Sequence, residues 1–227
     1  MSVITSNKSS IGEHFLNVFR AGLSTAPFTG GIASLMTDYI PSGKQKRLEE
    51  LAKKTAEDLE ALQDKIDTDR IKSDEYAHIF ETSLRYASME YRKEKLDAYR
   101  AILVNSLHKT TTLDTEKEYF LDMVNKLSVI HILLLNFLSD PKKYCHENNI
   151  PESKIQGGYN LFMAVIFPKT YLDTIKLAFG ELFSMGLINV DKNAFGTMTS
   201  SQGFGLLNHV MSDLGTRFVK FISSSRG

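Results

Sequence analysis

The sequence contains a single cysteine, Cys145, among its 227 residues. An internal disulfide bond needs two cysteines, so the chain has no disulfide framework of the kind that stabilises small secreted domains. Residues 1–23 also lack the uninterrupted apolar core of a signal peptide, because Glu13, His14 and Arg20 interrupt it. Both absences predict a protein of the reducing cytoplasm.

Neither sign of charge dominates the chain, and no apolar run is long. Lysine plus arginine and aspartate plus glutamate each number 27, which gives a formal net charge of zero. Proteins that hold nucleic acid or anionic membranes by bulk attraction usually carry a basic excess, which is missing here. The longest apolar run falls short of the roughly 20 residues that a membrane-spanning helix needs. The composition therefore predicts an ordinary soluble protein.

Recognisable motifs of catalysis and metal binding are also missing. The chain has no Ser-x-Gly elbow and no G-x-G-x-x-G, and its six histidines form no H-x-x-x-H or H-E-x-x-H pair. Cys145 and His146 are adjacent, but two side chains cannot supply the three or four ligands of a zinc site. His131 lies in the most apolar segment, so we expect a hydrogen-bonded histidine of the core. The sequence predicts no metal, no cofactor, no small-molecule substrate and no enzymatic activity.

Paired carboxylates occur at several places in the first half, for example Glu57 with Asp58 and Asp74 with Glu75. All of them lie in charge-dense segments of helical periodicity. Charged residues at i,i+4 spacing on a solvated helix face explain such pairs without catalysis. We therefore expect these carboxylates to be solvent-exposed.

Apolar residues recur at helical spacing through the first half of the chain. Residues 10–23 predict a short amphipathic helix, and residues 32–40 a second one that ends at Pro41. Residues 42–107 predict a long antiparallel helical hairpin, kinked in its second arm near Lys93. The expected seam of the first arm consists of Leu48, Leu51, Thr55, Leu59, Leu62 and Ile66. The expected seam of the second arm begins with Tyr76, Ile79, Phe80, Leu84 and Ala87.

The polar stretch HKTTTLDT predicts a boundary between a domain of residues 1–108 and a domain of residues 114–227. The stretch LSVIHILLLNFLSDP predicts an apolar helix of about 11 residues that Asp140 and Pro141 stop, and an amphipathic helix from about 169 to 185 follows. The segments LINV and LLNHVM resemble strands joined by a Gly-rich loop, and Ser212 can cap a last helix. The order helix, strand, loop, strand, helix predicts a winged-helix-like bundle with a small β-hairpin. The predicted fold class is mainly α.

The segment APFTGGIASLMTDYIPSGKQKR permits three interpretations. A P-loop needs a preceding strand and a Gly-Lys-Ser/Thr ending, and neither is present. The glycines can instead form a corner between two packed helices, which we favour. A partner-binding or membrane-binding segment stays open because basic residues follow the apolar ones. The candidate residues are Phe28, Gly30, Gly31, Ile32, Leu35, Met36, Lys44, Lys46 and Arg47.

The winged-helix-like part raises the question of nucleic acid. Its expected recognition helix carries Lys169 and Lys176, and its expected wing carries Lys192. These three lysines are the candidate nucleic-acid contacts, but the face is nearly neutral, whereas DNA readers usually present more arginine and lysine. A winged helix used for protein contact or dimerisation fits the charge at least as well.

Three segments together resemble a known family: PFTGGIASLMTDYIP with KQKRLEELAKK, then RYASMEYRKEKLDAYRAILVNSL, then EKEYFLDMVNKLSVIHILLLNFL. They are similar to uncharacterised bacterial helical proteins related to the abortive infection alpha family, which is associated with phage defence. The resemblance covers about residues 26–140 and rests on helix-packing patterns. It implies a bacterial cytoplasmic protein and a defence component, and it carries no catalytic residue.

The sequence thus predicts a non-enzymatic interaction or regulatory protein that binds a protein partner or a second copy of itself. One alternative is a DNA-binding regulator that uses its C-terminal part. A further alternative is a membrane-perturbing effector that uses residues 10–40.

Overall fold

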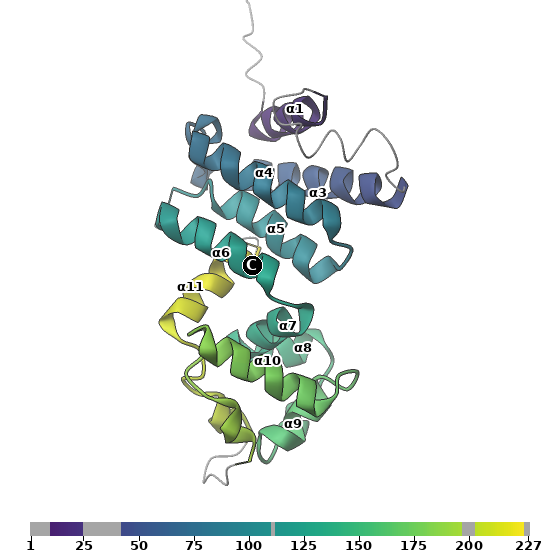
Figure 1. The fold of residues 1–227 in the computed structure, drawn as a ribbon, viewed down its shortest axis with the longest axis vertical. Coiled ribbons are helices and arrows are strands. Elements are labelled where there is room, and N and C mark those ends of the chain that lie inside the picture. Colours follow the sequence, from purple (N-terminus) through teal and green to yellow (C-terminus); the bar gives the residue numbers. More distant parts are fainter. Residues whose placement is uncertain (1–9, 25–41, 110–111, 197–202, 225–227) are drawn as a thin grey trace, which may run out of the picture. The chain divides into compact units, whose positions relative to one another are not determined.

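The computed structural model describes residues 10–24, 42–109, 112–196 and 203–224. Over these ranges the chain is mainly helical, as predicted, and its only β-structure is two isolated bridges (Figure 1). The chain divides into two compact units. The first runs through Lys126 and also includes the C-terminal segment from Phe221, and the second is Leu127–Lys220.

The first unit is a bundle of α-helices. Its members are α1 (Ile11–Ser24), α3 (Ser42–Ala61), α4 (Asp74–Met89), α5 (Lys93–Asn105) and α6 (Asp114–Lys126). Helix α3 packs against α1, α4 and α5, and α6 packs against α4 and α5. The short 3-10 helices η2 (Gln63–Lys65) and η3 (Arg70–Lys72) connect α3 to α4.

The core of this bundle is the seam that the helical spacing predicts. All six positions of the first arm are buried, from Leu48 to Ile66, and so are the five positions at the start of the second arm. Helix α1 adds Phe15 and Phe19, both buried, and the edge of the Phe15 ring meets the Phe80 ring at 5.5 Å. Ser73 caps α4, since its hydroxyl accepts the backbone N–H of Tyr76 at 3.2 Å.

The predicted long hairpin is wrong in its second arm. The chain does not continue through a kink at Lys93; α4 ends at Met89, and α5 begins at Lys93 and packs back against α4. The first unit is therefore a bundle of several shorter helices rather than two long arms. The physical reason lies at Glu90, whose side chain accepts the backbone N–H groups of Tyr91 and Arg92 in the turn between the two helices.

The last helix, α11 (Asp213–Ile222), ends against α5 within the first unit. The amide nitrogen of Asn105 donates to the carbonyl oxygens of Phe221 at 2.7 Å and Ser223 at 3.0 Å. The Phe221 ring also meets the ring of Phe120 from α6 at 5.7 Å. A buried amide and an aromatic pair thus fix the end of the chain.

The second unit is built around the apolar helix α7 (Val129–Ser139), which matches the predicted segment. Helices α8 (Pro141–Glu147) and α10 (Leu172–Ser184) pack on α7, and α9 (Tyr159–Ile166) packs on α10. The remaining elements are the 3-10 helices η4 (Glu152–Lys154), η5 (Lys192–Phe195) and η6 (Gly203–Leu207). Helix α10 is followed by a glycine that reverses the chain, because Gly186, just after the C-cap Met185, takes a φ of +73°.

The predicted β-hairpin and winged helix are not formed in the described residues. Segments 187–190 and 206–211 form one isolated bridge, between Ile188 and Met211, and the backbone N–H of Asn189 donates to the carbonyl of Val210 at 2.7 Å. The side chain of Asn189 donates to the carbonyls of His209 and Met211 at 3.2 and 3.1 Å, and His209 has a φ of +60°. A left-handed residue cannot continue a strand. The flanking residues coil into η5 and η6 instead.

Candidate functional site

Most of the segment predicted to bind a partner or a membrane lies outside the described residues, namely Phe28, Gly30, Gly31, Ile32, Leu35 and Met36. Its basic residues fall in the first turns of α3, where Lys46 is exposed and Lys44 and Arg47 are partly buried. The choice between a packed corner and a membrane-binding segment stays a prediction. In the part of the chain that the structure describes, no helix combines the length and the apolar character needed to cross a bilayer.

The three lysines predicted to contact nucleic acid lie in the second unit. Lys169 is exposed in the turn before α10. The Lys176 ammonium lies 5.8 Å from the centre of the Phe195 ring, and the aliphatic chain of Lys192 lies over Gly180 of α10. Lys176 and Lys192 therefore take part in the packing of η5 on α10. A role of the three lysines in nucleic-acid binding stays a prediction.

A distinctive exposed surface of the first unit is the reversal between α4 and α5. Residues 85–92 have the sequence RYASMEYR and are called the RYASMEYR turn below. One carboxylate oxygen of Glu90 accepts the backbone N–H groups of Tyr91 at 2.9 Å and Arg92 at 3.0 Å. The N–H of Glu90 donates to the carbonyl of Ala87 at 3.1 Å. Glu90 is thus the residue at which α4 stops, and its carboxylate holds the two backbone N–H groups that precede α5, so the reversal is tight.

A buried lysine anchors this turn to the end of α6. Lys95 is 8% exposed, and its ammonium donates to the carbonyl of Asn125 at 3.1 Å and lies 3.7 Å from Glu90. Burial lowers the pKa of Lys95 below its ordinary value, although Glu90 acts in the opposite direction. Burial acts to raise the pKa of Glu90, but the N–H groups of Arg92 and Tyr91 and the Lys95 ammonium outweigh it and lower that pKa. The carboxylate therefore stays ionised at neutral pH.

The same turn presents large apolar and aromatic groups to solvent. Met89 is 65% exposed and Tyr91 is 68% exposed. The Arg92 guanidinium lies 5.5 Å from the centre of the Tyr91 ring, and that of Arg85 lies 5.4 Å from the centre of the Tyr86 ring. Tyrosine, arginine and methionine are the residue types enriched at protein–protein interfaces. The geometry therefore suits contact with another protein surface.

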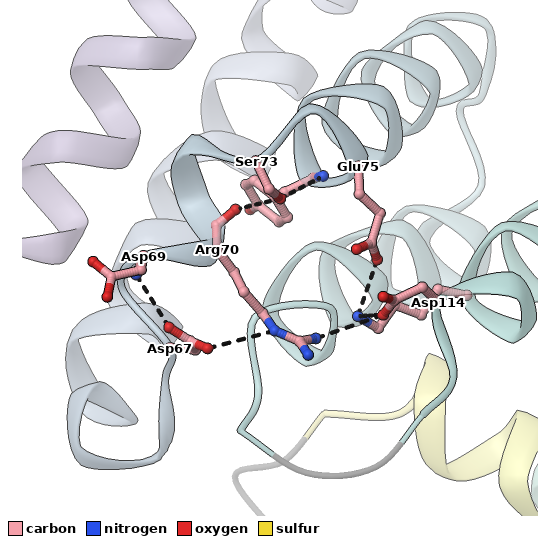
Figure 2. A network of polar contacts seen from close by, with 8 residues as sticks. Asp67, Asp69, Arg70, Ser73, Glu75 and Asp114 are labelled. Carbon is pink, nitrogen blue, oxygen red and sulfur yellow. Dashed lines mark hydrogen bonds and ion pairs between the residues drawn. The ribbon is translucent and has the colours of Figure 1, made fainter.

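A second polar cluster holds α6 against α4 and η3 (Figure 2). The Lys117 side chain is only 2% exposed, and its ammonium donates to Glu75 at 3.1 Å and Asp114 at 2.8 Å. Arg70 bridges Asp114 at 3.7 Å and Asp67 at 3.5 Å. The hydrogen bond from Lys117 is the main cause of the lowered pKa of Asp114. Cations and carboxylates alternate through this cluster, which therefore acts as a structural support.

The structure also informs the candidates for chemistry. In the ranges that the structure describes, no three side chains of His, Cys, Asp or Glu gather as metal ligands would. The buried Cys145 has a thiol pKa raised by burial and by the nearby Glu152 carboxylate. A raised pKa disfavours the thiolate, which is the nucleophilic form. Cys145 is thus a structural cysteine. His131 is buried and hydrogen-bonded, as predicted.

The sequence alone did not reveal the RYASMEYR turn as a site. The charged stretch EYRKEK indicated only an interruption of the apolar stripe. The signal that could have found the turn is the pair of Arg–Tyr neighbours on either side of Met89, because tyrosine, arginine and methionine are all enriched at protein interfaces.

Comparison with known families gives one match. The model of the family described as abortive infection alpha matches residues 43–220, which is most of the chain and contains all of α4, α5 and α6. The resemblance to this family is thus confirmed from residue 43 onward, and the match extends through the second unit. Comparison with curated proteins and with solved structures gave no match.

Proposed function

The chain belongs to the abortive infection alpha family, and we propose that it is a bacterial phage-defence component that acts by binding a protein partner through the RYASMEYR turn. The family's name supports the defence part of this proposal. The exposed residues of the turn support the binding part. The turn lies inside the matched range, so both arguments concern the same part of the chain.

The proposal rests on the exposed side chains of Met89 and Tyr91, which lie on a turn held by Glu90 and Lys95. Interfaces draw most of their binding energy from a few buried anchors, and a tyrosine can bury on the order of 150 Å² or more. Ordering such side chains on binding costs free energy, which is smaller when they are already held. Arg92 stacks on Tyr91, and Glu90 and Lys95 hold the backbone beneath it. Binding at this turn therefore requires little reorganisation.

Phage plating on bacteria that express the protein tests the proposal. The double variant Met89→Ser with Tyr91→Ser removes both anchors of the turn. The matched control is Leu161→Ser with Tyr171→Ser, whose parent residues are 67% and 85% exposed in the second unit. All four side chains are exposed, so each substitution should change the free energy of unfolding by less than about 0.5 kcal/mol. Equal melting temperatures of the two double variants confirm that premise.

We expect the native protein and the control variant to reduce plaque formation by some phages of a diverse panel, and the turn variant to lose at least about tenfold of that protection. Absence of protection against every phage would contradict the defence role. Equal protection by both variants would contradict the role of the turn. Light scattering of the purified native protein and the turn variant shows whether the bound partner is a second copy of this chain.

A further inference from the structure

We infer that the second unit contains a serine-hydrolase-like centre made of Ser128, His131 and Glu181, which accepts the acyl group of an exposed ester. This inference does not rest on the proposed function. It departs from the expectation that the protein is not an enzyme. It rests on two hydrogen bonds that join three side chains in series.

The three side chains are joined in series. The hydroxyl of Ser128 lies 2.7 Å from Nδ1 of His131, and Nε2 of His131 lies 2.7 Å from a carboxylate oxygen of Glu181. Ser128 precedes α7, His131 lies in its first turn, and Glu181 comes from α10, fifty residues further along the chain. A nucleophile, a base and a group that orients the base are the components of an activated serine.

The backbone determines where the imidazole proton lies. The N–H of Ser128 donates to Nδ1 of His131 at 3.1 Å, so Nδ1 must carry a lone pair rather than a proton. The neutral ring therefore has its proton on Nε2, which donates to the carboxylate of Glu181. The single lone pair of Nδ1 is shared by two donors of the same residue, the Ser128 N–H at 3.1 Å and the Ser128 hydroxyl at 2.7 Å, and the hydroxyl is the nearer of the two. This is the protonation state in which a histidine acts as a general base toward serine, with the two ring nitrogens exchanged relative to the usual order.

The local cap does not explain the third member. Ser128 and His131 form a capping box at the start of α7, and that box needs only these two residues. Glu181 contributes nothing to capping, yet it meets Nε2 at 2.7 Å with its own side chain 47% exposed. A carboxylate at this position stabilises the imidazolium that forms when the serine loses its proton.

The surroundings favour a solvent-accessible acyl ester. Ser128 is an exposed residue, so an ester can reach its hydroxyl, whereas His131 is buried and protected. The N–H groups of Val129 and Ile130 belong to the first turn of α7, where a helix has no internal acceptors, and can stabilise a developing oxyanion. Leu177, 58% exposed, lies one helical turn before Glu181 and offers apolar surface to an aliphatic acyl chain.

The proposed reaction balances with water as the only co-reactant. Oγ of Ser128 attacks the ester carbonyl, and its proton moves to Nδ1 of His131. The tetrahedral intermediate expels the alcohol, which takes that proton, and leaves an acyl-serine. Water then attacks the acyl-serine, again losing a proton to Nδ1, and that proton returns to Oγ when the carboxylic acid departs. Ser128 and His131 are the catalytic residues, and Glu181 is a positioning residue.

Labelling with an alkyl fluorophosphonate, followed by mass spectrometry of the modified peptide, tests the centre in the full-length protein. We expect Ser128 to be labelled and Ser139, an exposed serine at the other end of α7, to stay unlabelled. The variant Ser128→Asn keeps a good N-cap residue and should lose all labelling. The variant His131→Gln should slow labelling about 100-fold, which is the low end of the contribution of a general base. Melting temperatures establish that both variants are folded.

The labelling rates of two Glu181 variants distinguish a positioning role of this carboxylate from a purely structural one. In Glu181→Gln the imidazolium that forms during the reaction loses its counter-charge, so labelling should slow, and Glu181→Asp, which keeps the carboxylate, should restore part of the rate. Turnover of 4-nitrophenyl butyrate should follow the same order of variants. No labelling of native Ser128 above the level of Ser139 would overturn the inference, and so would a labelling rate unchanged in folded His131→Gln.

Discussion

The carboxylate of Asp58 in α3 accepts two hydrogen bonds from the guanidinium of Arg100 in α5, at 2.5 Å from Nε and 2.7 Å from Nη2. The Asp58 side chain is 4% exposed and that of Arg100 is 20% exposed. The prediction that Glu57 and Asp58 are both solvated is therefore wrong for Asp58, while Glu57 is exposed. Two planar groups in a bidentate arrangement fix the register of α3 on α5.

Asp58→Ala should destabilise the protein by about 3 kcal/mol. Removing one partner of a buried pair leaves the other charge without compensation, which typically costs about 3 to 5 kcal/mol, and the remaining exposure of Arg100 favours the lower end. Glu57→Ala is the neighbouring control and should cost less than about 0.5 kcal/mol. Urea denaturation of the two variants measures the difference, and similar values for both would contradict a stabilising pair.

Leu59→Ala should cost roughly 2 to 5 kcal/mol, because Leu59 is fully buried at the centre of the first seam. Leu113→Ala removes the same atoms from a side chain that is 68% exposed in the same unit, and it should change the free energy of unfolding by less than about 0.5 kcal/mol. Thermal or urea unfolding distinguishes the two. An equal loss of unfolding free energy in both variants would contradict the assignment of Leu59 to a buried face of α3.

These two cases show which parts of the fold the sequence predicts. The seam from Leu48 to Ile66 is a local pattern, since each apolar side chain lies one helical turn from the next. The Asp58–Arg100 pair joins residues 42 positions apart, and nothing in the charged surroundings of Asp58 identifies its partner. A carboxylate that is buried with a partner and one that is solvated look alike in a single sequence.

The reversal at Glu90 and the failed β-hairpin have the same origin. A break in an apolar stripe is compatible with a kink or a reversal, and the outcome depends on the hydrogen bonds of Glu90 within the turn and on the contact of Lys95 with Asn125. Residues 187–190 have the apolar composition of a strand, but the side chain of Asn189 takes the carbonyls of its would-be partner. The sequence does not indicate the hydrogen bonds that join Ser128, His131 and Glu181, because Glu181 lies fifty residues beyond His131.

Gly215→Ala should destabilise the protein by about 1 to 3 kcal/mol, the usual cost of overpacking. Gly215 lies in α11, and a Cβ atom there would lie 2.0 Å from the carbonyl oxygen of Leu187, which must then shift. Gly158→Ala is the matched control, because a Cβ atom at that position meets nothing within 4 Å and its φ of −84° suits alanine. Differential scanning calorimetry compares the two variants, and a harmless Gly215→Ala would show that α11 does not pack so closely on Leu187.

The last prediction concerns acid and the cluster around Lys117. Because the folded protein lowers the pKa of Asp114, the ionised carboxylate favours the folded state. This contribution is fully present above the ordinary aspartate pKa of about 4 and is lost as the pH falls through the lower pKa of the folded state. The Asp114 side chain is 56% exposed, so solvent screening limits the contribution to under about 1 kcal/mol.

Asp114→Asn should therefore be less stable than the native protein at pH 7, and the difference should shrink on acidification. In a Lys117→Met background the pH-dependent part should shrink, because Lys117 is the main cause of the lowered pKa of Asp114, while Glu75 and Arg70 contribute less. Urea titrations across this pH range measure both differences, and a difference between native protein and Asp114→Asn that stays constant with pH would contradict the link between the lowered pKa and stability.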